Sequence, residues 1–282
     1  MATEAPIDAL LLDMDGVLYH GNAPLPGAAD FLRGIAHIPH LFVTNNPIRT
    51  PEQVAERFEA IGLPRPEPEQ ILTSAAAPAA WLATERPGFR FFAVGADGLH
   101  RALRSAGGRG DRQQADFVVV GEGPGLDFDS LCTGIDLIVK HGARLVVTNP
   151  DTSVDDHHDG RHRVLPGGGA LVAPFALASG VEPIVIGKPE PALFRMALAR
   201  LGLRFGLRLG LGAERCVMIG DRPDTDIAGA VRCGIRAALV RTGRFAPGEP
   251  WPNDLPRPHW DRDTLDALAA DLLPLLPKRL QS

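Results

Sequence analysis

The sequence has little cysteine, little lysine and no long hydrophobic run. Its three cysteines, Cys132, Cys216 and Cys233, are too few and too scattered for a disulfide framework or a zinc cluster, so a reducing compartment is expected. No stretch approaches the roughly 18 uncharged apolar residues of a transmembrane helix. The first apolar run, Ile7–Leu12, contains Asp8 and follows no basic segment, unlike a signal peptide. We therefore expect a cytoplasmic protein without a membrane partner.

Composition and charge exclude further classes. The hydrophobic content of 45% and the charged content of 22% are typical of a globular chain rather than a disordered one. A net charge of −5 gives no support for a nucleic-acid partner. The 29 basic residues include only three lysines, Lys140, Lys188 and Lys278. Each retained lysine is therefore a candidate for a role that arginine cannot fill.

Short apolar segments alternate with helix-length segments along the whole chain. We predict buried strands at Ile7–Leu12, Leu41–Val43, Phe91–Val94, Phe117–Val120, Leu145–Val147, Ile184–Ile186, Val217–Ile219 and Ala237–Val240. Residues with helical spacing lie between them at Pro51–Ile61, Ser130–His141, Pro191–Leu201 and Asp224–Cys233. This alternation indicates βαβ units and parallel sheets that are covered on both faces. The predicted fold class is α/β.

Proline and glycine punctuation suggests two domains. A proline-rich segment, Leu63–Gln70, precedes a self-contained run of strand and helix signals, and glycine-containing segments at Leu165–Ala170 and Ser179–Ile184 follow it. We predict that residues 75–180 form a second α/β domain inserted into a core of residues 1–74 and 181–282. A chain that crosses between domains twice suits a hinge.

Two carboxylates, Asp13 and Asp15, come directly after the first predicted strand and are followed by Gly16. Ligands of α/β sheets bind at the carboxyl ends of parallel strands. Two carboxylates about 4 Å apart repel each other by roughly 4 kcal/mol at an effective dielectric constant of 20. Such a pair therefore needs a cation or a shared proton. An acidic turn that caps the next helix is the alternative interpretation.

Two more strand ends carry polar groups. Thr44 and Asn45 follow Leu41–Val43, and a hydroxyl with backbone amides at this position can bind a phosphoryl oxygen. Lys188 follows Ile184–Ile186, where its amine can neutralise a carboxylate–phosphate pair as a point charge. An asparagine-rich turn and a solvated loop lysine are the respective alternatives.

A fourth group of acids follows the strand at Val217–Ile219. Asp221 comes directly after Gly220, and Asp224 and Asp226 lie near the start of the next predicted helix. Carboxylates in a first helical turn are ordinary capping residues, but three of them exceed what a cap requires. Hard oxygen ligands in this number suit Mg²⁺, which takes one or two carboxylates together with substrate phosphate and water.

In this order, the four motifs DxDG, TNN, GKP and GDxxxTD resemble those of the haloacid dehalogenase superfamily of aspartyl-phosphate phosphohydrolases. The intervening GADGLHRAL, ADFVVVGEG and GARLVVTNPD are similar to the branch with a large α/β cap between the second and third motifs. That branch includes p-nitrophenylphosphatases, NagD-like nucleotide and sugar phosphatases, pyridoxal phosphatase and phosphoglycolate phosphatase. The resemblance covers nearly the whole chain and implies a Rossmann-like, doubly wound parallel-sheet core with an inserted α/β cap that sets substrate specificity.

The resemblance also implies roles in catalysis and metal binding. Asp13 is the expected nucleophile that becomes the aspartyl-phosphate. Asp15 is expected to protonate the leaving alkoxide and then to deprotonate the attacking water. The resemblance assigns Mg²⁺ to Asp13, the backbone carbonyl of Asp15 and Asp221.

Other residues are expected to support this centre. Thr44 and the Asn45 amide would bind the phosphoryl group, and Lys188 would offset the charge on Asp13 and the phosphate. Asp226 and Asp224 would orient Lys188 or metal-bound water from outside the ligand shell.

The expected reaction is Mg²⁺-dependent hydrolysis of a small phosphorylated metabolite, such as a sugar phosphate, nucleoside monophosphate, phosphoglycolate or pyridoxal phosphate. A phosphomutase with the same chemistry and a catalytically idle ligand-binding relative are the alternatives. Exposed strand edges of the inserted domain could pair in a homodimer. We interpret Asp155–His162 as a polar hairpin loop rather than a transition-metal site.

Overall fold

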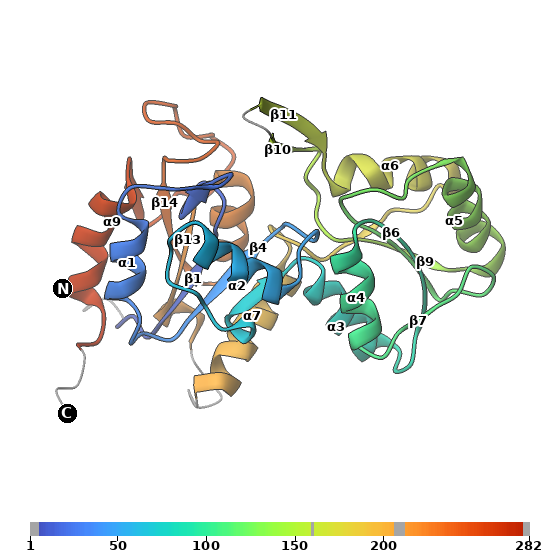
Figure 1. Ribbon diagram of the computed structural model, residues 1–282, viewed down its shortest axis with the longest axis horizontal. Coiled ribbons are helices and arrows are strands. Elements are labelled where there is room, and N and C mark those ends of the chain that lie inside the picture. The colour runs from blue at the N-terminus through green and yellow to red at the C-terminus, as the bar shows by residue number, and fades with distance from the viewer. Residues whose placement is uncertain (1–5, 159–160, 206–211, 279–282) are drawn as a thin grey trace. The chain divides into compact units, whose positions relative to one another are not determined.

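The computed structural model describes residues 6–158, 161–205 and 212–278 and contains two compact units (Figure 1). The first unit comprises Met1–Thr44, Ala55–Leu72 and Phe194–Ser282, and the second comprises Asn45–Val54 and Thr73–Leu193. Each unit combines a sheet with parallel strands and helices, which confirms the predicted α/β class. The functional division of the chain, with an inserted domain at residues 75–180, stays a prediction.

The first unit is built on a six-stranded, Rossmann-like sheet in the order β15–β14–β13–β1–β4–β5. β1 pairs in parallel with both β13 and β4, and all four of its residues are buried, as expected for a central strand covered on both faces. The strands are β1 (Ala9–Leu12), β4 (His40–Thr44), β5 (Ile71–Thr73), β13 (Cys216–Gly220), β14 (Arg236–Val240) and β15 (Trp260–Arg262).

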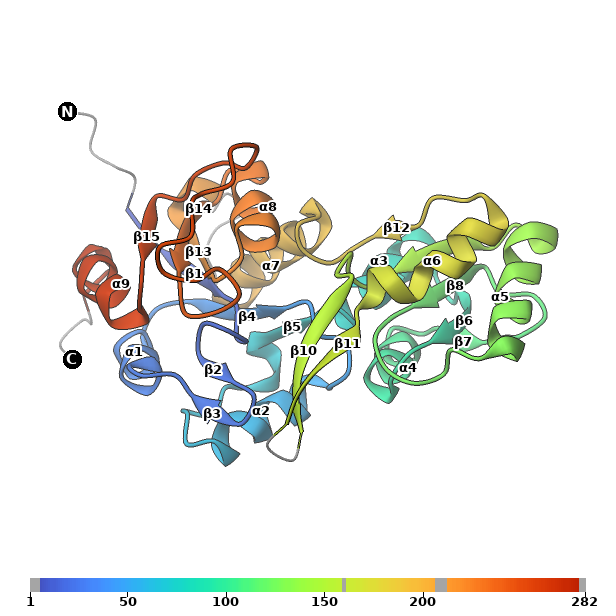
Figure 2. The same cartoon turned by 90° about the horizontal axis from the view of Figure 1, so that it is seen from above.

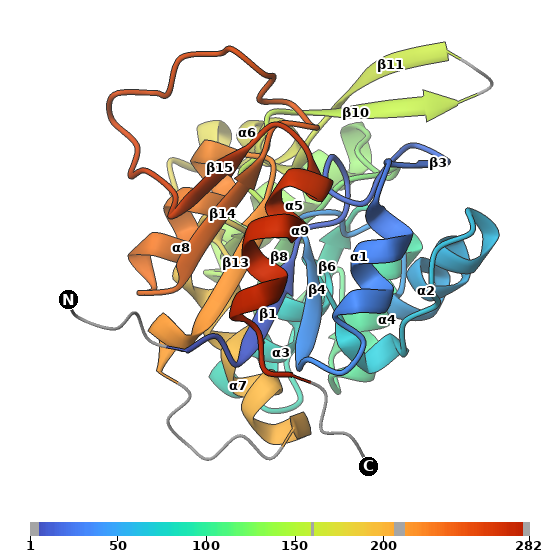
Figure 3. The same ribbon diagram turned by 90° about the vertical axis from the view of Figure 1, so that its left-hand side faces the viewer.

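Helices cover both faces of this sheet. Figure 3 shows α1 and α9 over the face toward the viewer, and Figure 1 shows α7 on the opposite side. The helices that accompany the sheet are α1 (Ala28–Gly34), α2 (Pro51–Ala60), α7 (Pro191–Phe205), α8 (Ala228–Arg232) and α9 (Leu265–Leu272). Short elements complete it: β2 (Tyr19–His20), β3 (Ala23–Pro24), and the helical turns η1 (Pro68–Gln70), η2 (Ala213–Arg215), η3 (Pro223–Ile227) and η4 (Leu273–Leu275).

The second unit has a five-stranded parallel sheet in the order β12–β9–β8–β6–β7. Its strands are β6 (Arg90–Val94), β7 (Arg109–Gly110), β8 (Phe117–Val120), β9 (Arg144–Val147) and β12 (Ile184–Val185). Its helices are α3 (Ala76–Glu85), α4 (Asp97–Ser105), α5 (Phe128–His141) and α6 (Gly168–Ser179).

Alternation along β8 shows how this sheet is covered. Val118 and Val120 belong to a hydrophobic core with residues of α5 and α6. The ring of Phe117, which points to the other face, contacts the Trp81 ring of α3 at a centroid distance of 6.4 Å. Figure 1 shows α5 and α6 on one side of the sheet and α3 and α4 on the other.

The remaining element is an antiparallel ribbon of β10 (Ser153–His158) and β11 (Arg161–Pro166), visible in Figure 2. It contains most of the predicted Asp155–His162 hairpin, whose residues 159–160 lie outside the described part, as do the side chains of residues 156–162. The interpretation that these side chains do not form a transition-metal site therefore stays a prediction. Within the described residues, no helix is both long and apolar enough to cross a membrane.

All eight predicted strands are present, but one predicted helix is wrong in part. The segment predicted as a single helix at Asp224–Cys233 consists of a π-helical turn, η3, followed by the short helix α8. Pro223 has no backbone N–H and begins the wider turn. Single π-helical turns often occur at functional sites, and this one contains the predicted site residue Asp226.

Candidate active site

Parallel pairing of β1 and β13 brings two predicted acids together. The register places Leu12 opposite Ile219, and the Asp13 N–H donates to the Ile219 carbonyl at 2.8 Å. Asp221 follows the end of β13 directly. Asp13 is 7% exposed and Asp221 is 4% exposed, so both carboxylates lie at the carboxyl edge of the sheet with little access to solvent.

The π-helical turn η3 adds a third carboxylate, that of Asp226. This residue is fully buried, and its Oδ2 accepts a hydrogen bond from the Arg222 N–H at 3.1 Å. One carboxylate oxygen each from Asp13, Asp221 and Asp226 lies within 4.8 Å of the others. We call these three residues the carboxylate cluster.

The carboxylate cluster fits a divalent cation. Three buried carboxylates repel one another unless a cation or protons compensate them. Their hard oxygen atoms are the ligands that Mg²⁺ and Ca²⁺ prefer. Within the described residues, no other group of three or more histidine, cysteine or acidic side chains shares this spacing. The sequence predicts Asp226 outside the ligand shell, and the structure brings its carboxylate to within 4.8 Å of the carboxylates of Asp13 and Asp221.

A loop after β14 holds Asp221 from the other side. The Arg244 N–H donates to Asp221 Oδ2 at 2.9 Å, and the Thr242 hydroxyl donates to the Gly16 carbonyl at 2.6 Å. A β-carbon on Gly243 would overlap the Asp221 carboxylate. Sequence reasoning missed this contribution, because a Thr-Gly pair after a strand is common to many turns.

Two predicted acids lie outside the carboxylate cluster. Asp15 is exposed and forms an isolated bridge with Tyr19. Asp224, whose side chain is 57% exposed, forms an ion pair with Arg222 at 2.7 Å. Partial burial would raise the pKa of Asp224, but hydrogen bonding to Arg222 and its charge bring that pKa below its ordinary value. The negative charge of Asp224 is therefore already compensated by Arg222 without a metal.

In the second unit, the second and third motifs meet. The Lys188 N–H donates to Asn45 Oδ1 at 2.8 Å, and Asn45 Nδ2 donates to the Lys188 carbonyl at 3.0 Å. The side-chain amide of Asn45 thus pairs with the backbone N–H and the backbone carbonyl of Lys188. Lys188 is 2% exposed. Thr44, the residue before Asn45, ends β4 in the first unit and is buried.

Further buried side chains surround Asn45. Its carbonyl accepts from the Ser74 hydroxyl at 2.5 Å and from Asn149 Nδ2 at 2.7 Å. Asn45 Nδ2 also donates to Asp151 Oδ2 at 3.0 Å, and Asn149 Nδ2 donates to Glu122 Oε1 at 2.8 Å. In the sequence, Asn149 and Asp151 are compatible with either a site role or a turn role. Sequence reasoning did not single out Glu122, although a glutamate directly after a strand–glycine end was a usable signal.

Comparisons with known proteins identify the family of the chain. Residues 10–109 match a model described as haloacid dehalogenase-like hydrolase, and residues 185–268 match a second HAD-hydrolase-like model. An acid sugar phosphatase of Staphylococcus epidermidis is 34% identical over 238 residues, which cover 83% of this chain and 86% of that protein.

Solved structures of phosphatases are also similar to this chain. NagD from E. coli K-12 is 32% identical, with a TM-score of 0.78 over 92% of this chain and 97% of NagD. A glycerol phosphate phosphatase from Mycobacterium tuberculosis, solved in complex with calcium, is 34% identical, with a TM-score of 0.73 over 84% of this chain and 66% of that one. The chain therefore belongs to the haloacid dehalogenase-like hydrolase family, in its NagD-like phosphatase branch.

Proposed function

We propose that the chain is a Mg²⁺-dependent phosphatase that hydrolyses a small phosphate monoester through an aspartyl-phosphate on Asp13. The carboxylate cluster carries this proposal, because it places the expected nucleophile within 4.8 Å of Asp221 and Asp226. These three residues would hold the cation, together with the backbone carbonyl of Asp15 that the sequence predicts as a ligand. When bound, Mg²⁺ would reduce the repulsion between the Asp13 carboxylate and the anionic substrate.

The proposed reaction has two steps at phosphorus. An Asp13 oxygen attacks phosphorus and the bond to the leaving alkoxide breaks, while Asp15 in its acid form donates a proton to that alkoxide. The Asp15 carboxylate then takes a proton from a water molecule. The water attacks phosphorus, releases inorganic phosphate and restores Asp13. The exposure of Asp15 supports its role, because a group that exchanges protons with substrate and water must be accessible.

Thr44, Asn45 and Lys188 are the proposed phosphate-binding groups. The Asn45 side chain already pairs with the Lys188 backbone and with Asp151. We therefore assign phosphate binding to the Asn45 backbone amide rather than to its side chain, together with the Thr44 hydroxyl. The Lys188 ammonium group would add a positive charge. Asp224 would act only indirectly, by holding Arg222 beside Asp221.

The proposed substrates are small phosphorylated metabolites: sugar phosphates, nucleoside monophosphates, phosphoglycolate and pyridoxal phosphate. The names of the relatives, acid sugar phosphatase and glycerol phosphate phosphatase, favour the sugar and polyol phosphates. A cytoplasmic location and a homodimer through the inserted domain at residues 75–180 belong to the same proposal. Light scattering tests the homodimer, which would have twice the mass of one chain.

Phosphate release from p-nitrophenyl phosphate tests the proposal. We expect turnover with Mg²⁺, loss of turnover with a chelator, and a decrease of at least about 1000-fold in Asp13→Asn. Asp30→Asn, the same change at an exposed position of the first unit, serves as the matched control and should retain full activity. Undiminished turnover in Asp13→Asn would refute the assignment of Asp13 as the nucleophile. Isomerised phosphosugar without phosphate release would instead indicate a phosphomutase.

A further inference from the structure

Three strands of the second sheet end around Asn45. Glu122 follows β8, Asn149 follows β9 and Lys188 follows β12. The carboxyl edge of a parallel sheet is where α/β proteins bind ligands. Here Asn45 of the chain itself lies at that edge. Gly187 permits this approach, because a β-carbon there would overlap the Thr148 carbonyl and lie 2.9 Å from Asn45 Oδ1.

The Asn149 amide has a single orientation in this network. One Nδ2 hydrogen goes to the Asn45 carbonyl at 2.7 Å and the other to Glu122 Oε1 at 2.8 Å, while Oδ1 accepts from the Asp151 N–H at 3.1 Å. A flipped amide would bring Oδ1 toward two acceptors. Asn149 is fully buried and Glu122 is 2% exposed, so water cannot replace these hydrogen bonds at low cost.

This network fixes the backbone of both proposed phosphate-binding segments. Ser74 and Asn149 hold the Asn45 carbonyl and so fix the plane of the Asn45–Asn46 peptide. The Asn45 N–H belongs to the preceding peptide, and it is positioned through the Asn45 α-carbon, because the carbonyl and the side chain on that carbon are both held. The Asn45 side chain meanwhile holds the N–H and the carbonyl of Lys188. Rotation of the Asn45–Asn46 peptide would break two hydrogen bonds, and rotation of either peptide that flanks Lys188 would break one.

We propose that Glu122 and Asn149 are positioning residues for the phosphate-binding segments at Asn45 and Lys188. Glu122 orients the Asn149 amide, and Asn149 in turn holds the Asn45 carbonyl. This inference rests on the proposed function of those segments. Misplacement of a binding group by about 1 Å can cost on the order of 100-fold in rate. We therefore expect disruption of the network to weaken phosphate binding.

Single substitutions along the network test the inference. Asn149→Ala removes one donor to the Asn45 carbonyl and should raise KM for p-nitrophenyl phosphate about tenfold. Ser74→Ala removes the other donor, leaves a smaller cavity, and should raise KM about threefold. Glu122→Leu should behave like Asn149→Ala. Glu122→Gln keeps an oxygen for the Asn149 amide and should stay within about twofold of the wild-type KM.

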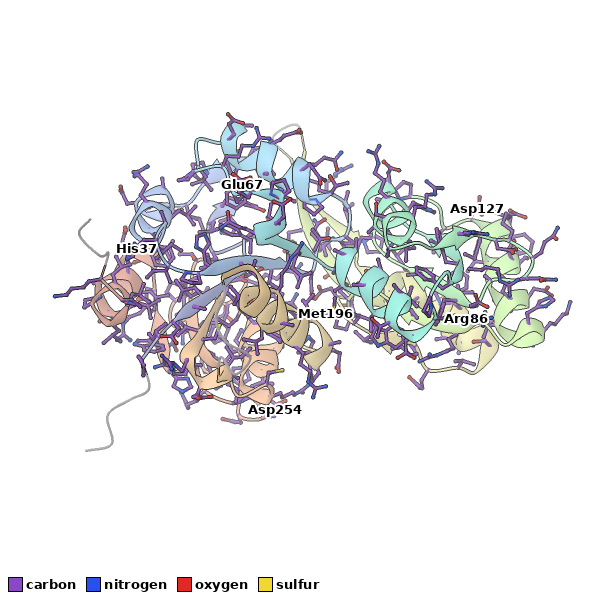
Figure 4. The ribbon with its side chains drawn as sticks, turned by 90° about the horizontal axis from the view of Figure 1, so that it is seen from below. His37, Glu67, Arg86, Asp127, Met196 and Asp254 are labelled. Carbon is purple, nitrogen blue, oxygen red and sulfur yellow. The ribbon has the colours of Figure 1, made fainter. Side chains whose placement is uncertain are left out.

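Two readouts separate positioning from a general loss of stability. The dissociation constant of inorganic phosphate, measured by calorimetry with Mg²⁺ present, should rise by the same factors as KM. The Mg²⁺ concentration for half-maximal activity should not change, because the carboxylate cluster contains none of these residues. Ser130→Ala is the matched control: it removes the two hydrogen bonds of the Ser130 hydroxyl with the Asp127 backbone at the start of α5, in the same unit (Figure 4). It should lower Tm without changing phosphate binding.

Unchanged phosphate binding in Asn149→Ala, Ser74→Ala and Glu122→Leu would overturn the inference. An equal weakening of phosphate binding in Ser130→Ala would overturn it as well. A wild-type protein that releases no phosphate from any ester would refute the proposed function instead, while calorimetry with inorganic phosphate would still decide the role of Glu122 and Asn149.

Discussion

Asp224 and Asp226 are two residues apart in the sequence and have opposite surroundings. Asp226 is fully buried in the carboxylate cluster, whereas the side chain of Asp224 is more than half exposed and pairs with Arg222. The sequence could not distinguish them, because both lie near the predicted start of a helix. The π-helical turn η3 decides which of them faces Asp13 and Asp221.

This contrast predicts different effects of the same substitution. Asp226→Asn removes one of three clustered negative charges and should raise the Mg²⁺ concentration for half-maximal activity by about tenfold or more. Asp224→Asn serves as its control and should change that concentration by less than about twofold, since exposed ion pairs contribute little. Metal titrations of phosphate release measure both. A larger effect in Asp224→Asn would contradict the assignment.

Lys188 is one of only three lysines and is 2% exposed. Lys188→Arg keeps the charge but adds a wide planar group to a buried position. We expect it to lower kcat/KM by about 100-fold or more while Mg²⁺ binding is retained. Lys140→Arg, at a position where the side chain is 71% exposed, should have no effect. Full activity in Lys188→Arg would show that a positive charge alone is sufficient.

At the scale of elements, the loop after β14 connects the first and fourth motifs. It donates one hydrogen bond to the Gly16 carbonyl and one to the Asp221 carboxylate. The close approach of this loop to Asp221 depends on the absence of a side chain at Gly243. The loop is therefore part of the support of the carboxylate cluster.

Gly243→Ala should displace either the loop or the Asp221 carboxylate. We expect at least a tenfold loss of activity together with weaker Mg²⁺ binding, because second contacts of metal ligands typically contribute 10-fold to 100-fold. Gly110→Ala, where a β-carbon meets nothing within 4 Å, is the control and should leave both unchanged. Unaltered metal binding in Gly243→Ala would show that the loop adjusts without moving Asp221.

The elements that the sequence predicted correctly share a physical cause. Central strands such as β1 and β8 are buried on both faces, so a continuous apolar run marks them. β10 and β11 have no such run, and their pairing depends on backbone hydrogen bonds between polar segments. The strand-end positions of Asp13 and Asp221 were predictable for the same reason as the strands. The contacts of Asn149 with Asn45 and with Glu122 were not, because sheet topology brings together residues that are 104 and 27 positions apart in the sequence.

At the scale of the whole molecule, the proposed catalytic groups are divided between the two units. Thr44 and the carboxylate cluster belong to the first unit, whereas Asn45 and Lys188 belong to the second. The second motif is itself split at the Thr44–Asn45 peptide bond. Metal binding should therefore stabilise the first unit through its own residues.

Metal removal tests this expectation in the intact chain. A cation that binds only the folded state stabilises it by about 2.7 kcal/mol at 100 times its Kd. Saturating Mg²⁺ should therefore raise the Tm of the wild-type protein by several degrees. In Asp221→Asn the increase should largely disappear, and the metal-free Tm should be no lower, since one repulsive charge is gone. An equal Mg²⁺ effect in both proteins would place the cation elsewhere.

Mass spectrometry can detect the proposed aspartyl-phosphate on Asp13 itself. The wild-type protein, mixed with p-nitrophenyl phosphate and Mg²⁺ and quenched in acid within one turnover, is digested and its peptides are weighed by mass spectrometry. We expect a phosphoryl group on Asp13 that appears and decays at rates compatible with turnover and is absent in Asp13→Asn. A phosphoryl group on another residue, or phosphate release from Asp13→Asn at the wild-type rate, would contradict this expectation.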